Sequence, residues 1–239
     1  MKKAILVVSF GTSHLDALNN SIKKIEDSIQ ENFKEYDVFR SFTSHMIVRK
    51  LKEKHNMEVL FPEDALKKLG EEGYEEVIVQ PLHIIPGEEF DYIKHMVKEY
   101  EPCFKKIEIG RPIFHYEGFE SGPDDYSYFV DTMKDLIEKN SPCVFVGHGS
   151  AHPSNAVYGC LQSVLIDKDY EDVFVGTVEG YPNFSNVLKK AKKKDIKEIT
   201  IIPLMVVAGD HAKNDMASDE EDSWKSRFES EGIKANVIL

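Results

Sequence analysis

The chain has 239 residues, of which 41% are hydrophobic and 30% charged. This composition is ordinary for a globular protein, and the length allows one or two buried cores. The formal net charge of -12 argues against a nucleic-acid partner, because neutralising phosphates requires clustered Lys and Arg.

The cysteines and the N-terminal apolar run indicate in which cellular compartment we expect the protein. Cys103, Cys143 and Cys160 show no CxxC spacing, which is typical of a reduced, cytoplasmic protein. The start MKKAILVVSFG resembles a signal peptide, but its apolar run is short and no small-residue cleavage site follows. We interpret it as a first strand. No apolar stretch is long enough to span a membrane, so we expect no membrane contact.

Apolar runs and helical periodicity predict alternating strands and helices in the first half of the chain. In chain order we predict a strand over 4–10, a helix over 15–33, a strand over 36–42, helices over 44–54 and 62–69, a strand over 76–85, a helix over 90–100 and a strand over 105–109. A polar segment, 115–121, follows.

The second half repeats this order after a helix over 124–138. We predict strands over 143–146, 173–178, 198–207 and 234–239, with helices over 155–165, 184–193 and 221–229 and a helical turn from His211. The first half's fourth strand is followed by a helix, whereas the second half stops at its fourth strand. Either that helix was lost, or the sequence ends before its natural C-terminus.

An alignment of Pro81 with Pro203 indicates that the chain is duplicated. It also pairs Leu82 with Leu204, Gly87 with Gly209, and Glu89 with His211. Strands that alternate with helices form parallel sheets. We therefore predict an α/β fold of two similar Rossmann-like domains, 1–121 and 122–239, each with a four-stranded parallel sheet, facing each other across a cleft. A single eight-stranded sheet is the alternative.

Three polar residues of the second half follow predicted strands. His148, Glu179 and His211 lie just past the first, second and third strands, and the first and third strands of a doubly wound sheet are neighbours. Two imidazoles and one carboxylate suit divalent Fe, Co, Ni or Zn. Alternatively, each histidine is only a hydrogen-bonded loop residue, and Gly-His-Gly-Ser only a tight turn.

The other candidate positions favour simpler interpretations. Phe10, Ser44 and Glu89 correspond to the three candidate ligands, so the first half lacks the same set. His83 lies inside an apolar run, which favours a hydrogen-bonded core or cleft-wall histidine. His152 precedes a proline at a helix start, which favours capping. The sequence has no GxGxxG or P-loop motif, so we expect no nucleotide.

The segments VGHGSAHPSNAVY, GTVEGYP and PLMVVAGDHAKNDMASDEEDSWK resemble the anaerobic sirohydrochlorin cobaltochelatases of the CbiK type, within the class II chelatase superfamily. ILVVSFGTSH, FTSHMIVRKL and VQPLHIIPGEEFDYI resemble the first half of that family. The resemblance implies a chelatase-like fold and insertion of Co2+, without ATP, into sirohydrochlorin or its reduced precursor in anaerobic cobalamin biosynthesis. It also implies that His148, Glu179 and His211 bind the metal, and that family chains continue past Leu239.

The chemistry of metallation suggests further roles. Insertion must remove pyrrole protons, and a neutral imidazole accepts protons near neutral pH, so we expect His148, Glu179 and His211 to act catalytically, with His148 the favoured acceptor. By analogy with the family, the macrocycle would be bent between the domains. Backbone N–H groups at helix starts would hold its carboxylates, with help from hydroxyls such as Ser41, Thr43 and Ser44. The expected substrate contacts are Ser9, Phe10, Gly11, Thr12, Ser13, Glu89, Gly149 and Ser150.

Two alternatives remain at this point. The same ligand set would serve a chelatase for iron or nickel, because metal affinities at such sites follow a common order. A non-catalytic protein that carries a metal or tetrapyrrole would share the fold. A homo-oligomer is also compatible with the sequence.

Overall fold

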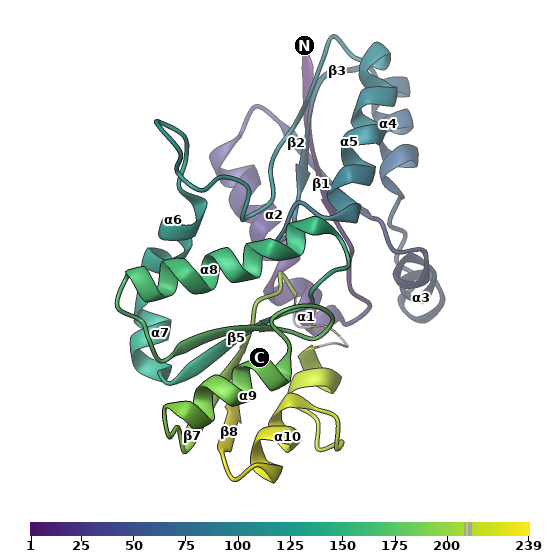
Figure 1. Cartoon of the computed structure of the whole chain (residues 1–239). Coiled ribbons are helices and arrows are strands. Elements are labelled where there is room, and N and C mark those ends of the chain that lie inside the picture. The colour runs from purple at the N-terminus through teal and green to yellow at the C-terminus, as the bar shows by residue number, and fades with distance from the viewer. Residues whose placement is uncertain (208, 210–211) are drawn as a thin grey trace. The chain divides into compact units, whose positions relative to one another are not determined.

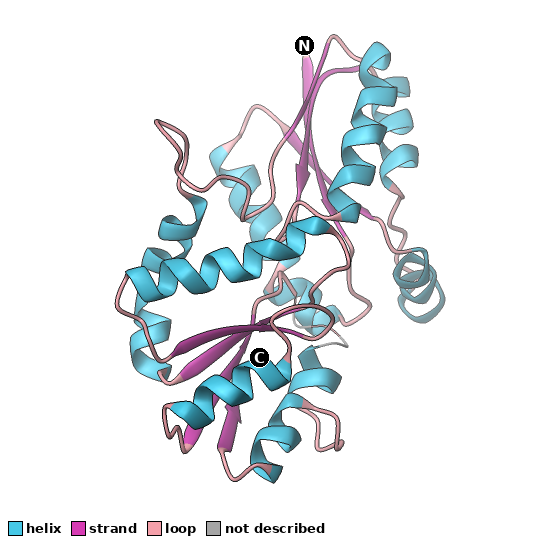
Figure 2. Ribbon diagram, in the orientation of Figure 1, coloured by secondary structure: helices cyan, strands magenta, loops and turns pink. Residues whose placement is uncertain are grey.

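The structure, a computed structural model, describes residues 1–207, 209 and 212–239. The chain divides into two compact units, Met1–Ile113 and Phe114–Leu239, and each is described by itself. Among the described residues each unit holds one four-stranded parallel sheet flanked by helices (Figures 1 and 2). The two-domain prediction is confirmed, and the single eight-stranded sheet is wrong. No helix in the described part of the chain has the length and apolar character to cross a membrane.

The first unit has the strand order β2-β1-β3-β4, with β1 central. Its strands are β1 Lys2–Ser9, β2 Asp37–Phe42, β3 Tyr74–Pro81 and β4 Lys106–Ile109. Its helices are α1 Leu15–Asn20, α2 Ile22–Asn32, α3 His45–His55, α4 Pro62–Glu71, α5 Glu88–Tyr100 and the short 3-10 helix η1 Glu101–Cys103.

The core of the first unit follows the alternation of side chains along β1. Leu6 and Val8 pack on one face of the sheet in a cluster with residues of α4 and α5, whereas Ile5 and Val7 pack on the other face. Both faces of a central parallel strand are buried, which explains why β1 is apolar without interruption from Ala4 to Val8.

The second unit repeats this topology as β6-β5-β7-β8, with β5 central. Its strands are β5 Cys143–Gly147, β6 Val173–Thr177, β7 Glu198–Pro203 and β8 Lys234–Val237. Its helices are α6 Asp125–Thr132, α7 Lys134–Asn140, η2 Pro153–Asn155, α8 Ala156–Asp167, α9 Phe184–Lys193, the π-helix η3 Ala212–Met216 and α10 Trp224–Ser230.

Helices cover both faces of the second sheet. Val144 and Val146 of β5 belong to a buried cluster with Trp224 and Phe228 of α10 and with residues of α9. Phe145 points to the opposite face, where its ring lies 5.8 Å from that of Phe129. Figure 1 shows α8 on one side of this sheet and α9 and α10 on the other.

Backbone hydrogen bonds show that the two halves share one plan at the carboxyl ends of their strands. The N–H of Leu82 donates to the carbonyl of Val8 at 2.7 Å, and the aligned N–H of Leu204 donates to Val146 at 2.8 Å. The aligned residues Phe10 and His148 are each followed by a glycine with positive φ, which is 92° at Gly11 and 88° at Gly149. The duplication inferred from the sequence therefore extends to the loops.

Several element bounds differ from the prediction. The helix expected over 15–33 breaks at Ser21, whose hydroxyl donates to the carbonyl of Ala17 at 2.6 Å, and the helix expected over 124–138 breaks at Met133. The strands expected to reach 85 and 207 end at Pro81 and Pro203. Proline has no N–H with which to extend a ladder, so the apolar residues beyond it belong to loops.

The start of the second unit also differs from the predicted boundary after residue 121. The side chain of Phe114 is fully buried, and its ring lies 4.9 Å from Tyr126 and 5.0 Å from Phe129. These contacts with α6 place Phe114 in the second core, although the polar segment 115–121 separates it from that helix in the sequence. The pattern of the sequence alone therefore does not assign Phe114 to the second unit.

Replacing Phe114 by Ala is expected to lower the free energy of unfolding by about 3–5 kcal/mol, the usual cost of removing a fully buried phenyl ring. Urea denaturation followed by circular dichroism measures this. The matched control is Phe119→Ala, because Phe119 is 77% exposed and its loss should change stability by less than about 0.5 kcal/mol. Equal effects of the two substitutions would show that Phe114 is not a core residue.

Gly149→Ala is expected to destabilise the second unit by at least about 2 kcal/mol. A Cβ at Gly149 would lie 1.8 Å from the carbonyl oxygen of Glu179, and its φ of 88° adds backbone strain. Gly159 in α8 is the control, because a Cβ there meets nothing within 4 Å, and alanine should be neutral or stabilise the helix by up to about 1 kcal/mol. Denaturant midpoints compare the two, and an unchanged Gly149→Ala protein would contradict the close approach.

Candidate functional site

The candidate site lies at the carboxyl edge of the second sheet. Two loops leave that edge: the His148 loop, residues 148–152, follows β5, and the Glu179 loop, residues 178–182, follows β6. Because β5 is central and pairs with both β6 and β7, three strand ends meet at this edge. The structure therefore brings the His148 and Glu179 loops side by side, as their positions in the sequence predicted.

The two loops are held together through their backbones. The N–H of Glu179 donates to the carbonyl of His148 at 2.7 Å, and the N–H of Val178 donates to that of Gly147 at 3.0 Å. Only glycine fits at position 149, because the Glu179 carbonyl occupies the space of a side chain. The side chain of His148 is half-buried and that of Glu179 is exposed. These backbone contacts fix the Cα positions from which the side chains of His148 and Glu179 extend.

The imidazole of His148 is oriented by its own loop. Its Nδ1 lies 3.0 Å from the carbonyl oxygen of Gly149. A carbonyl only accepts, so Nδ1 carries the proton and the lone pair of the neutral ring is on Nε2. A backbone partner on one ring nitrogen is the arrangement that metal-binding histidines commonly use.

The third expected ligand, His211, lies outside the described residues. The backbone on either side is described: the N–H of Gly209 donates to Val207 at 3.0 Å, and the N–H of Lys213 donates to Gly209 at 3.1 Å. The aligned bonds of the first unit, Gly87 to Ile85 and Asp91 to Gly87, are 2.9 and 3.0 Å long. Within the described part of the chain, no three His, Cys, Asp or Glu side chains are grouped to hold a metal.

The cysteines do not add thiolates to this set. Cys143 is buried in β5, and burial raises the pKa of its thiol to about 12. Burial also raises the pKa of Cys160. Both thiols stay protonated near neutral pH, so neither of the two is a ready thiolate ligand.

The backbone N–H groups of the His148 loop have acceptors within the protein. Gly149 donates to the Tyr158 hydroxyl at 3.4 Å, Ser150 to Asn155 Oδ1 at 3.1 Å and His152 to Ser150 Oγ at 3.0 Å. These three N–H groups shape the loop, and the expectation that N–H groups of this loop bind carboxylates stays a prediction. His152 accepts from the Ser154 N–H at 3.1 Å and so caps η2, as the sequence predicted.

The aligned positions of the first unit carry different side chains. Phe10 is 49% exposed at the position of His148, and Ser44 caps α3 by accepting from the N–H of Ile47 at 3.4 Å. Thr12, expected to contact substrate, accepts from the N–H of His14 at 3.1 Å. Gly11 lies against the ring of Phe42. Ser9 is buried and Ser13 half-buried in the same loop.

A group of buried polar atoms in the first unit was not expected. Among the described residues, both ring nitrogens of His83, one carboxylate oxygen of Glu89 and the hydroxyls of Ser41 and Thr43 are buried without a hydrogen-bond partner. His83 Nε2 lies 4.0 Å from Glu89 Oε2, too far for a hydrogen bond. Burial lowers the pKa of His83 to about 4. The prediction that His83 is a hydrogen-bonded core or cleft-wall histidine is therefore wrong in one respect, because neither ring nitrogen has a hydrogen-bond partner.

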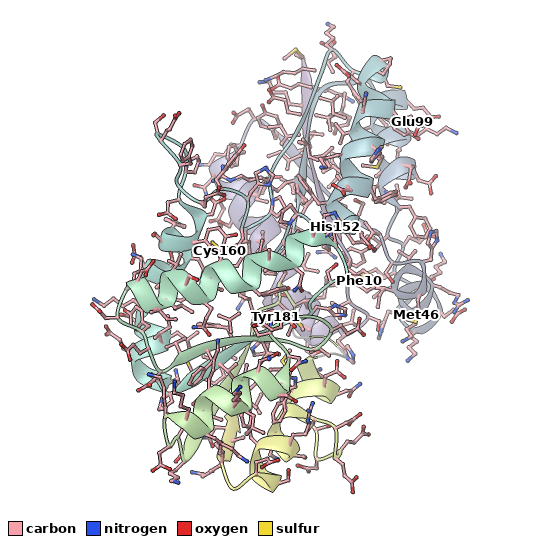
Figure 3. All side chains as sticks on the ribbon, in the orientation of Figure 1. Phe10, Met46, Glu99, His152, Cys160 and Tyr181 are labelled. Atoms are coloured by element: carbon pink, nitrogen blue, oxygen red, sulfur yellow. The ribbon has the colours of Figure 1, made fainter. Side chains whose placement is uncertain are left out.

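Figure 3 marks residues of three of these strand-end loops: Phe10 after β1, His152 in the His148 loop and Tyr181 in the Glu179 loop. Tyr181 is 66% exposed, although its backbone carbonyl accepts from Asn155 Nδ2 at 2.7 Å. The loops therefore present side chains outward from a backbone that is fixed within each unit.

Solved structures share this architecture. SirB from Bacillus subtilis with Fe3+ has a TM-score of 0.65 at 17% identity, covering 99% of this chain and 88% of that one. CbiX, described as the terminal enzyme for biosynthesis of siroheme in denitrifying bacteria, has a TM-score of 0.55 at 14% identity, covering 99% and 90%. At these identities the likeness shows the fold.

Sequence relatives are closer. The sirohydrochlorin cobaltochelatase of Salmonella typhimurium is 38% identical over all of this chain and 89% of its own length. The sirohydrochlorin cobaltochelatase CbiKC of Nitratidesulfovibrio vulgaris is 30% identical over all of this chain and 83% of its own. The family model for cobalt chelatase (CbiK) matches residues 3–239. The resemblance seen in the sequence is thereby confirmed, and this chain belongs to the cobalt chelatase (CbiK) family.

Proposed function

We propose that this protein is a sirohydrochlorin cobaltochelatase, which inserts Co2+ into sirohydrochlorin or its reduced precursor without ATP in anaerobic cobalamin biosynthesis. The observation that carries the proposal is the family match over residues 3–239, supported by relatives of that name at 38% and 30% identity. The backbone contact between the His148 and Glu179 loops agrees with it, because it assembles an imidazole and a carboxylate at one edge.

The metal ion is a substrate in this proposal and is held by His148, Glu179 and His211. His148 would bind through Nε2, which holds the lone pair when Nδ1 donates to Gly149. The carboxylate of Glu179 is exposed at the neighbouring strand end. Nitrogen and oxygen ligands suit divalent cobalt, and a set of three leaves positions for the nitrogens of the macrocycle. The ion can then pass from protein to tetrapyrrole one ligand at a time.

Metallation also requires proton acceptors. Two pyrrole N–H bonds break as the divalent ion forms bonds to the ring nitrogens, and both protons leave the macrocycle. Once its Nε2 has released the ion, the neutral imidazole of His148 can take one of these protons near neutral pH, and we assign this role to it; the second proton passes to water. Glu179 and His211 would keep the ion in place while the transfer proceeds.

The first unit would contribute groups that contact the tetrapyrrole. A buried polar atom without a partner costs free energy, so the carboxylate oxygen of Glu89 and the hydroxyls of Ser41 and Thr43 are suited to a ligand's donors and acceptors. Glu89 can accept from a pyrrole N–H, and the hydroxyls can donate to substrate carboxylates. Phe10, half-exposed, offers a ring to a flat macrocycle. Ser9, Gly11, Thr12 and Ser13 shape the loop that carries it, and Ser150 offers its hydroxyl.

His211→Ala, His148→Ala and Glu179→Gln are each expected to lower the rate of anaerobic Co2+ insertion by at least about 100-fold, because each removes a metal ligand. The change in the visible spectrum of sirohydrochlorin measures insertion. Excess Co2+ should restore part of the rate for Glu179→Gln but not for His148→Ala, which also loses the proton acceptor.

His55→Ala is the control, because His55 is exposed at the end of α3. An unchanged rate in His211→Ala would remove His211 from the mechanism. Tight binding of Co2+ or sirohydrochlorin without acceleration over the uncatalysed reaction would replace the chelatase by a carrier. Faster insertion of Fe2+ or Ni2+ under competition would change the assigned metal.

The buried His83 predicts a stability that falls with acid. Its pKa of about 4 in the folded protein is below the ordinary value of 6.5, so the unfolded chain binds more protons between these values. The contribution of neutral His83 to the free energy of unfolding is therefore fully present above pH 6.5 and is lost as the pH falls toward 4. Between pH 7 and 4.5 we expect wild type to lose roughly 2–3 kcal/mol more than His83→Gln. Urea denaturation at both pH values measures this, and parallel losses would contradict a buried neutral His83.

A further inference from the structure

One side chain at the start of α8 contacts the backbones of both loops of the candidate site. Asn155 Oδ1 accepts from the N–H of Ser150 at 3.1 Å, and Asn155 Nδ2 donates to the carbonyl of Tyr181 at 2.7 Å. Ser150 lies two residues after His148, and Tyr181 lies two residues after Glu179. A single amide group therefore connects the loop that carries one candidate ligand with the loop that carries the other.

The amide is fitted closely into the Glu179 loop. A Cβ on Gly180 would lie 2.6 Å from Asn155 Oδ1, so the loop passes the amide at a distance that only glycine allows. On the other side of the amide, the two loops are already in backbone contact through Glu179 and His148. Asn155 therefore binds the His148 loop on one side and the Glu179 loop on the other, and the two loops also bind each other directly.

A second residue of α8 holds the His148 loop from the same helix. Tyr158 follows Asn155 by almost one helical turn, and its hydroxyl accepts from the N–H of Gly149 at 3.4 Å. Tyr158 is buried, and burial raises the pKa of its phenol, so it stays a neutral hydroxyl at physiological pH. It contacts one loop, whereas Asn155 contacts both. Asn155 is therefore the residue that relates the two loops to each other.

We propose that Asn155 is a positioning residue of the chelatase: it fixes the separation of His148 and Glu179 and thereby the geometry in which they hold the divalent ion. This inference rests on the proposed function. The role needs one acceptor and one donor that diverge from a short stem, which is the pattern of the asparagine amide. Aspartate has no donor, serine has a single oxygen, and glutamine is one methylene longer.

The test uses Co2+ alone as probe and the full-length protein. Wild type is titrated anaerobically with Co2+, and the visible absorption of the bound ion reports both affinity and coordination geometry. Asn155→Ala is expected to weaken Co2+ binding by about 10- to 100-fold, the usual effect of removing a group that orients metal ligands, and to change the spectrum of the bound ion.

Asn155→Asp is the second variant and keeps the acceptor for Ser150 while losing the donor to Tyr181. Its effect should lie between wild type and Asn155→Ala. The added negative charge would by itself tighten the binding of a cation, so weaker binding cannot come from charge. This variant also preserves the test if alanine prevents folding.

Asn140→Ala is the matched control. Asn140 lies in the same unit and its Nδ2 donates to the carbonyl of Leu136 at 2.8 Å, much like the bond from Asn155 to Tyr181, but at the end of α7. It should lower thermal stability by no more than Asn155→Ala, which loses two hydrogen bonds, and leave Co2+ affinity and spectrum unchanged.

Each outcome decides the matter. If Co2+ binding is lost in His148→Ala and weakened with an altered spectrum in both Asn155 variants, the inference is supported. If His148→Ala loses binding but both Asn155 variants match wild type, the inference fails while the proposed metal site stands. If wild type does not bind Co2+, or His148→Ala binds it equally well, the proposed site and the inference both fail.

Discussion

The parallel pairing of each central strand with a neighbour on either side is the constraint on which the rest of this structure depends. β5 pairs with β6 and β7, and β1 pairs with β2 and β3, so three strands of each unit end at one edge. Parallel strands deliver their carboxyl ends to the same place, and the connections return behind the sheet. Residues 31 positions apart, His148 and Glu179, are thereby joined by a backbone hydrogen bond of 2.7 Å.

The two halves of the chain carry one backbone plan and two sets of side chains. The N–H groups of Leu82 and Leu204 donate to the carbonyls of Val8 and Val146 over nearly equal distances. Where the second unit has His148 and Glu179, the first has an exposed phenylalanine and a helix-capping serine. Among the described residues, the first unit buries ring nitrogens of His83, a carboxylate oxygen of Glu89 and the hydroxyls of Ser41 and Thr43 without hydrogen-bond partners. Such atoms lower the stability of the fold.

Most of the fold could be predicted from the sequence because the elements are strongly patterned. The apolar runs of β1 and β5 predicted buried strands, and the repeated Pro-Leu and Gly positions predicted two similar halves, each with a four-stranded parallel sheet, as the structure has them. The break at Ser21 was missed because its neighbours continue the helical periodicity, and the bend lies in the backbone of one residue. The inclusion of Phe114 in the second core depends on tertiary contacts that no local pattern contains.

The loops that carry the candidate site residues could be predicted from the sequence, but the residues that hold these loops in place could not. Histidine and glutamate after predicted strands are visible in a sequence, and their loops do meet. The internal acceptors of the Gly149, Ser150 and His152 N–H groups could not be foreseen, because helix-start residues look alike in a sequence whether their donors face a ligand or a neighbouring side chain. Asn155 was not recognised, since its two partners are distant from each other in the chain. The lack of partners for His83 is likewise a property of packing.

The glycines at 11 and 149 have a consequence for how such a protein can change. Each lies immediately after a candidate site residue, Phe10 or His148, and the two adopt nearly the same positive φ, so the path of the loop is set by the glycine and not by its neighbour. Phenylalanine and histidine occupy the preceding position in the two halves without any change in the turn. A duplicated gene could therefore exchange the side chain before the glycine in one copy by a single codon change while the other copy kept its own. Because the residue that bends the chain is distinct from the one that precedes it, the two halves can diverge at that position without a change in the backbone.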